Sequence, residues 1–195
     1  MRKYFTGIFL LILFPLFLNA QNFDIHLLKK INPDTIPTST FWKQISYSAY
    51  WVPAAVSIGQ IGYGFAANDK NSKRYGVETA VDVGIGQLLS AGIKHIFNRP
   101  RPYASWPNEI YPVNYGTDYS FPSGHTTVAF STMTSLAYTR HQLYITVPIT
   151  LWSSSVGYSR MYLGRHYPTD VLGGMAIGII SGIIGHWVTG RMYSH

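Results

Sequence analysis

The sequence predicts an all-α fold, arranged as a multi-pass bundle of transmembrane helices. Hydrophobic residues make up 47% of the 195-residue chain and charged residues only 12%, against about 25% in typical soluble domains. Apolar segments of helical length recur along the chain, and none shows the sustained alternation of a β-strand. The Lys and Arg residues that separate these segments follow the positive-inside rule.

Composition also excludes several classes of protein. The hydrophobic fraction is too high for a disordered chain. The absence of cysteine excludes disulfides, thiolate chemistry and Cys-bound zinc. The net charge of +7 is compatible with phosphorylated or anionic partners, yet no basic run resembles a nucleic-acid-binding arm. We therefore expect no nucleic-acid partner, and the sequence indicates no obligate protein partner.

The N-terminus is typical of a secretory signal. Arg2 and Lys3 precede an uncharged apolar run over residues 4–23, and the small Ala20 precedes the expected cleavage point. The run also has the length of a membrane-spanning helix, about 20 residues. Residues 1–20 are therefore predicted to be either a signal peptide or a first transmembrane helix. In both cases the chain then continues on the outer side of the membrane.

The remaining chain divides into a lead-in and a helical domain. Residues 21–43 are predicted as an extracytoplasmic lead-in, followed by one domain over residues 44–195. The predicted helices cover residues 44–68, 77–97, 126–139, 143–159 and 171–190. Several of them are shorter than the roughly 18 residues expected of an uncharged span, so a soluble all-α domain is the alternative.

Two patterns favour a membrane bundle over that alternative. Alternation from an outer start places the loop 69–74, Arg140 and Arg191 on the inner side, and all three positions carry Lys or Arg. Glycines repeat at four-residue spacing in the last segment, at Gly174, Gly178 and Gly182. Such a repeat allows two helix backbones to approach closely within a membrane.

Three clusters of residues suit phosphate chemistry. They are residues 94–102 (KHIFNRPRP), residues 122–125 (PSGH), and Ser159-Arg160 followed by His166 and Asp170. Lys94, Arg101 and Arg160 are cations beside apolar segments, where uncompensated charge is costly. A phosphorylated ligand would compensate them, because the Arg fork matches phosphate oxygens and Lys adds a point charge. The backbone N–H groups of Ser123 and Gly124 precede a helix start and can face the same anion.

Two histidines in these clusters suit the two ends of a phosphoryl transfer. His166 lies four residues before Asp170, whose carboxylate can hold one ring nitrogen and leave the other free. His125 closes the second cluster.

The three clusters together resemble the signature of the type 2 phosphatidic acid phosphatase (PAP2) superfamily, K-x6-R-P, P-S-G-H and S-R-x5-H-x3-D. The superfamily includes membrane lipid phosphatases, soluble bacterial acid phosphatases, glucose-6-phosphatase and vanadium haloperoxidases. Every specified position is matched in order, and the resemblance covers about residues 44–191. Arg99 and Pro100 repeat the Arg-Pro pair, but residue 92 is Gly, so only the register through Arg101 has its Lys. Arg165, beside the matched histidine, is not specified by the signature.

The resemblance implies a role for each matched residue. His166 is expected to attack phosphorus and form a phosphohistidine, Asp170 to fix its tautomer, and His125 to protonate the leaving oxygen and then activate water. The residues expected to bind the phosphate oxygens are Lys94, Arg101, Arg160, Ser123 and Gly124. No metal and no cofactor are expected, since side-chain cations take the place of a metal.

The resemblance also implies a membrane phosphatase that acts on a phosphorylated lipid. The expected location is a bacterial inner membrane with the site facing the periplasm, where alternation places all three clusters. The compact size resembles that of lipid A 4′-phosphatases, and undecaprenyl diphosphate, phosphatidylglycerol phosphate and phosphatidic acid are alternative substrates. A soluble periplasmic acid phosphatase, a vanadium-dependent haloperoxidase and a non-catalytic binding or transport protein are further alternatives. The aromatic segment 98–121 is expected to cover the site.

Overall fold

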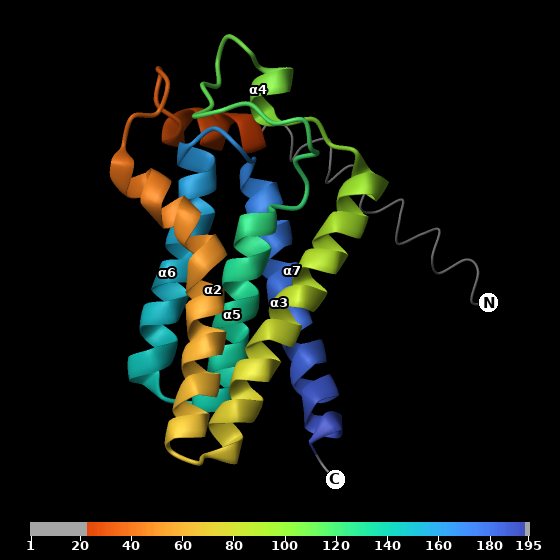
Figure 1. Ribbon diagram of the computed structural model, residues 1–195. Helices are drawn as coiled ribbons and strands as arrows, with labels where there is room; N and C mark the ends of the chain where they lie inside the picture. The colour runs from red at the N-terminus through yellow and green to blue at the C-terminus, as the bar shows by residue number, and fades with distance from the viewer. Residues whose placement is uncertain (1–22, 194–195) are drawn as a thin grey trace, which may run out of the picture.

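In the computed structural model, which describes residues 23–193, long helices run side by side along one bundle (Figure 1). They are α2 (Thr40–Ala66), α3 (Lys70–Phe97), α5 (Gly124–Arg140), α6 (Leu143–Tyr162) and α7 (Pro168–Met192). The single-turn α4 (Pro102–Ser105) follows α3, and a short helix over residues 23–31 precedes α2. The predicted all-α bundle is confirmed. The predicted signal or first span, residues 1–20, lies outside the described residues.

Each predicted helix between residues 44 and 190 is present and is longer than the sequence indicated, although α2 ends at Ala66, before the predicted residue 68. α3 begins at Lys70, so most of the loop predicted over residues 69–74 forms its first turns. Asp69 caps this helix, because its Oδ1 accepts the Asn71 N–H at 3.0 Å. The chain leaves α3 through Asn98, whose φ of 46° lies in the left-handed region that asparagine tolerates.

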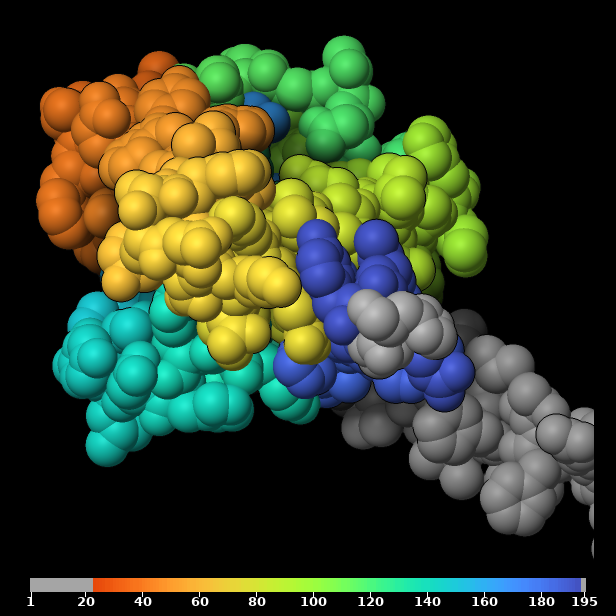
Figure 2. Space-filling model, turned by 60° about the horizontal axis from the view of Figure 1, so that its bottom comes forward, coloured from red at the N-terminus to blue at the C-terminus, as the bar shows by residue number. Residues whose placement is uncertain are grey.

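The two ends of the bundle differ in what they carry. The C-terminal ends of α3 and α6 meet the N-terminal ends of α5 and α7 at the end where α4 lies (Figure 1). The opposite end carries the α2–α3 turn, the α5–α6 turn and the C-terminal part of α7, which Figure 2 brings forward. Arg140 lies at that opposite end and donates to Ser72 Oγ at 3.2 Å. The predicted inner-side loops therefore share one end, and the three clusters share the other.

The glycine repeat of α7 packs against α5. A Cβ at Gly174 would lie 2.6 Å from the carbonyl oxygen of Ser123, and Gly178 and Gly182 meet atoms of α5 at the same distance. Real Cβ atoms do not approach other atoms so closely, so the two backbones can pack here only because these residues have no side chain. This agrees with the close helix approach predicted from the repeat.

Polar and apolar side chains are distributed as expected of a membrane protein. Large hydrophobic side chains are exposed around the bundle, among them Trp51, Ile58, Leu88, Leu151 and Ile180. Small hydroxyls lie between the helices, where the Oγ atoms of Ser131 and Ser181 are 2.7 Å apart. By length and composition alone, α7 is the one helix within residues 23–193 that satisfies the requirements of a span, and a buried core helix can satisfy them too. The large apolar side chains exposed on the other helices are stronger evidence for a membrane bundle, because contact between water and so much apolar surface is unfavourable.

Candidate active site

A cavity of about 280 Å³ lies where the three sequence clusters meet. The predicted site residues that line it are Lys94, Arg101, Gly124, His125, Arg160 and His166. Asp170 and Ser123 are fully buried behind this lining. The fold therefore brings both histidines and all three predicted phosphate-binding cations to one volume.

His166 lies in the turn between α6 and α7 and presents one ring nitrogen to the cavity. Its Nε2 lies 3.3 Å from Arg101 Nη1, while its Nδ1 lies 3.6 Å from Asp170 Oδ2. Nδ1 also lies 3.5 Å from Ser120 Oγ, so an Nδ1–H on this side of the ring leaves the Nε2 lone pair facing Arg101 and the cavity. Burial, with the charges of Arg101 and Arg160, lowers the pKa of His166 well below its usual value. This shift favours the neutral ring, which is the form in which a histidine can act as a nucleophile.

The carboxylate of Asp170 is fixed by the start of α7. Asp170 is the third residue of this helix, and its Oδ2 accepts the Tyr167 N–H at 2.9 Å, as an acidic residue at this position does. The hydroxyl of Ser120 donates to the same oxygen at 2.5 Å. Arg99 Nη1 donates to the other oxygen, Oδ1, at 2.7 Å. The carboxylate beside His166 is thus held on both oxygens.

Two of the predicted phosphate-binding cations are paired with a carboxylate of the chain. Arg101 Nη2 donates to Asp118 Oδ1 at 2.6 Å, and Lys94 Nζ donates to Asp118 Oδ2 at 3.2 Å. Burial alone would raise the pKa of Asp118, but the two cations outweigh it and hold this pKa well below its usual range. Asp118 is therefore ionised and lies where the anion of a substrate would be bound. It belongs to the segment that was predicted to cover the site.

Two further arginines line the cavity with incomplete hydrogen bonding. Arg160 donates to Ser46 Oγ at 2.5 Å, and Arg165 donates to Asn114 Oδ1 at 2.6 Å. Within the described part of the chain, the buried Nε atoms of both arginines have no hydrogen-bond partner. Burial and the neighbouring Arg101 lower the pKa of Arg165. Arg165, whose role the sequence left open, is thus a fourth cation of the cavity, and both arginines have donors to spare for an anion.

The second cluster contributes His125 and Gly124 to the cavity, but not the amide of Ser123. His125 is the second residue of α5 and contacts the ring of Tyr50, with centroids 4.7 Å apart. The Ser123 N–H donates to the carbonyl oxygen of Asp170 at 3.0 Å. The phosphate contact expected of this amide therefore has no counterpart in this arrangement. The bond instead ties the start of α5 to the start of α7, which sets the helix of His125 against the turn of His166.

Sequence reasoning missed three residues of this site. Asp118 and Ser120 lie just before the second cluster, and neither belongs to a pattern that marks it. Arg99 had a signal, since it repeats the Arg-Pro pair, but its register offered no phosphate contact. Its bond to Asp170 depends on how the turn after α3 meets the start of α7, and spacing along the chain does not contain that geometry.

Comparison with known proteins agrees with the fold and with the family that the sequence resembles. The PAP2 superfamily description matches residues 76–193. A lipid A 1-phosphatase of Porphyromonas gingivalis is 29% identical over 157 residues, 79% of this chain and 33% of the relative. An undecaprenyl-diphosphatase of Sulfolobus acidocaldarius is 27% identical over 197 residues, 91% of this chain and 88% of the relative. The crystal structure of Aquifex aeolicus LpxE superposes with a TM-score of 0.65 at 27% identity, covering 84% of this chain and 94% of that one.

The chain therefore belongs to the PAP2 superfamily. Its all-helical fold is that of the family, and the two relatives above are named as phosphatases. Fold, cavity and family together define a PAP2-type phosphatase.

The pairing of Asp118 with two cations of the cavity makes a testable prediction. The Asp118→Asn variant should bind inorganic phosphate about tenfold more tightly, because a charge that competes for Lys94 and Arg101 and repels the incoming anion is removed. Titration calorimetry with phosphate measures this. Glu109→Gln is the matched control, since it removes the same charge from the same segment outside the cavity lining. Weaker phosphate binding by Asp118→Asn would instead show that Asp118 serves to hold the cations in place.

Proposed function

We propose that this protein is a membrane phosphatase that removes a phosphate group from a lipid through a phosphohistidine at His166. The observation that carries the proposal is a cavity lined by four cations and two histidines that shares a wall with an apolar groove. The cations suit a phosphate group, and the groove suits the apolar part of the same substrate.

The proposed reaction has two steps at one phosphorus atom. His166 Nε2 attacks phosphorus and forms a nitrogen–phosphorus bond, while the bond from phosphorus to the lipid oxygen breaks and His125 gives that oxygen a proton. His125 then removes a proton from water, whose oxygen attacks the phosphohistidine and releases phosphate and neutral His166. Lys94, Arg101, Arg160 and Arg165 balance the charge on the phosphate oxygens throughout. Asp170 stabilises the positive imidazole that exists between the steps.

The groove supports a lipid as the substrate. It has a volume of about 410 Å³ and is lined by α2, α3 and Val128 of α5. Ala49, Tyr50, Gln87 and Val128 line both the groove and the cavity of His166. Side chains such as Pro53, Ala54 and Ile58 give it an apolar wall along α2. A substrate whose phosphate lies at His166 therefore has an apolar path between α2 and α3 for its chains.

We further propose that the site faces the periplasm from a bacterial inner membrane. The site lies at the end of the bundle opposite to the α2–α3 turn with Lys70, Lys73 and Arg74, and basic loops remain in the cytoplasm. Among lipid substrates, a lipid A 4′-phosphate stays the leading prediction. Assays of lipid A against undecaprenyl diphosphate and phosphatidylglycerol phosphate, with the released position identified by mass spectrometry, distinguish the candidates.

Replacing His125 and replacing His166 should impair different steps of the reaction. His125→Ala loses the proton donor, typically worth about 10²–10⁴-fold, on a lipid whose leaving alkoxide needs the proton. On p-nitrophenyl phosphate, whose leaving group is a weak base, it should release one p-nitrophenol per enzyme and accumulate phosphohistidine at His166. His166→Ala should show neither burst nor adduct. Rapid-quench kinetics with mapping of the phosphorylated residue measures both, and an adduct on Ser123 or His125 would refute the roles assigned.

A bulky side chain in the groove should lower activity on a lipid substrate and leave activity on a soluble substrate nearly unchanged. Ala54→Trp places a large ring in the groove and should lower kcat/KM for the lipid about tenfold or more, since displacing two methylenes costs about 1.6 kcal/mol. Activity on p-nitrophenyl phosphate should stay within about twofold, because the cavity itself is unchanged. Ala55→Trp, the next residue and not part of the groove lining, is the control. Equal loss on both substrates would contradict a lipid path along α2.

A further inference from the structure

Arg99 joins two buried carboxylates at the base of the site. Its Nη1 donates to Asp170 Oδ1 and its Nη2 donates to Asp24 Oδ2, both at 2.7 Å. Its guanidinium carbon also lies 4.0 Å from the centroid of the Tyr167 ring. One planar side chain, with little freedom to rotate, thus connects Asp170, which holds the nucleophile, to a residue near the start of the described chain.

Asp24 contacts the first turn of α7 in addition to Arg99. Its Oδ1 accepts the backbone N–H of Thr169 at 3.0 Å, and its Oδ2 also accepts the Thr169 hydroxyl. Thr169 directly precedes Asp170, and its hydroxyl accepts a second bond from Arg99 Nη1 at 2.7 Å. Asp24 itself is fully buried, at 0% exposure. A buried carboxylate with such partners holds Thr169 and Arg99 in position and favours the charged form of the Arg99 guanidinium.

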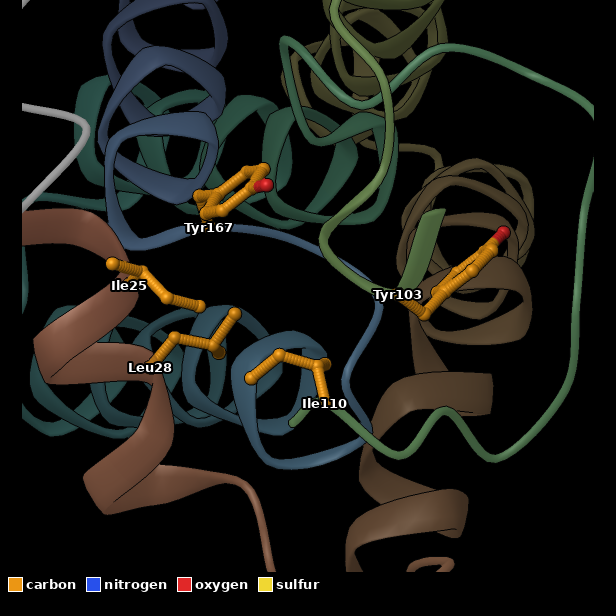
Figure 3. Packing of buried hydrophobic residues seen from close by; sticks show 5 residues of the cluster. All are labelled: Ile25, Leu28, Tyr103, Ile110 and Tyr167. Carbon is orange, nitrogen blue, oxygen red and sulfur yellow. The ribbon is translucent and has the colours of Figure 1, made fainter. Parts of the chain in front are cut away.

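The helix of residues 23–31 is anchored firmly enough to keep Asp24 in place. Ile25 and Leu28 point from this helix toward Tyr167 and Ile110, as Figure 3 shows, and all four are buried in one cluster with Tyr103. The anchorage continues at Asn32, which ends this segment. Its Nδ2 donates to the carbonyl oxygens of Tyr111 and Tyr162 at 3.0 and 2.9 Å, and its Oδ1 accepts the Tyr111 N–H at 2.8 Å.

The charge that Asp24 brings bears directly on the nucleophile. Asp24, Arg99 and Asp170 carry formal charges of −1, +1 and −1, so the group is anionic overall. Without Asp24, Arg99 would neutralise Asp170 alone, and Asp170 would stabilise a positive His166 ring less. Burial would lower the pKa of Arg99, but Asp170 and Asp24 outweigh burial and raise it, so the guanidinium stays charged.

We infer that Asp24 is a positioning residue for the His166 nucleophile, acting through Arg99 and Asp170 from a segment that precedes the residues matched by the family. The inference rests on the proposed function, since it assumes that His166 attacks phosphorus. Asp24 does not line the cavity, so it acts on the nucleophile and not on the bound phosphate.

The first test compares Asp24→Asn with the wild type in the full-length protein. The rate of phosphohistidine formation per active site, measured by rapid quench with p-nitrophenyl phosphate, should fall about 10- to 100-fold, as when partners that orient a histidine are removed. Affinity for inorganic phosphate should change less than about twofold. Asp34→Asn, which removes an exposed carboxylate ten residues further along the same lead-in, should behave as the wild type.

The second test uses charge compensation to show whether Asp24 acts through Arg99. Asp24→Asn combined with Arg99→Gln restores the net charge of −1 on the group. The loss of rate in the double variant should therefore be smaller than the product of the two single losses. This comparison also covers the case in which Asp24→Asn alone folds poorly, because the double variant removes the guanidinium that has lost one of its two carboxylate partners.

The outcomes separate the inference from the function on which it rests. A wild-type rate per active site in Asp24→Asn, or a fall only in the number of active sites, would overturn the inference. Losses that multiply in the double variant would do the same. If the wild type itself forms no phosphohistidine, the proposed function fails.

Discussion

Four cationic side chains share one cavity at the end of this bundle, and the need to compensate their positive charge is the constraint on which the site depends. Lys94, Arg101, Arg160 and Arg165 converge there, and Asp118 supplies the one carboxylate that residues 23–193 contribute to the lining. Like charges that are brought together in this way favour a bound anion, and we propose that this anion is the phosphate group of the substrate. Burial, together with the same positive charge, lowers the pKa of His166 well below its usual value. The charge that we propose for substrate binding therefore also favours the neutral form of this histidine.

The helix packing places the chemistry with respect to this charge. Glycines of α7 allow its backbone to touch α5, and the Ser123–Asp170 backbone bond fixes the starts of the two helices against each other. Asp170 then both accepts the backbone N–H of Tyr167, the N-cap residue of α7, and serves as the carboxylate beside His166. Because Arg99 and Asp24 hold that carboxylate from the other side, the lead-in is part of the catalytic end of the molecule.

Much of this was predictable from the sequence because motif spacing encodes which residues must meet. The helical segments, the glycine contact and the convergence of Lys94, Arg101, His125, Arg160 and His166 follow from local patterns. What escaped prediction depends on contacts between distant segments. Asp118 contacts Lys94 and Arg101 only because of the course of the loop before α5, which carries no motif at this position. Asp24 contacts Arg99 because the helix of residues 23–31 packs against Tyr167. The start of α3 was missed for a local reason, since its first turns carry charges that resemble a loop until the Asp69 cap is taken into account.

A structure of the protein with bound vanadate tests the central claim most directly, because vanadate adopts the five-coordinate geometry of phosphorus under attack. The account predicts vanadium bonded to His166 Nε2, with its oxygens against Lys94, Arg101 and Arg160 and with the Asp118 carboxylate displaced from the two cations it now pairs. Vanadium bonded to His125 or Ser123, or vanadate bound outside this cavity while Asp118 keeps its place, would contradict it.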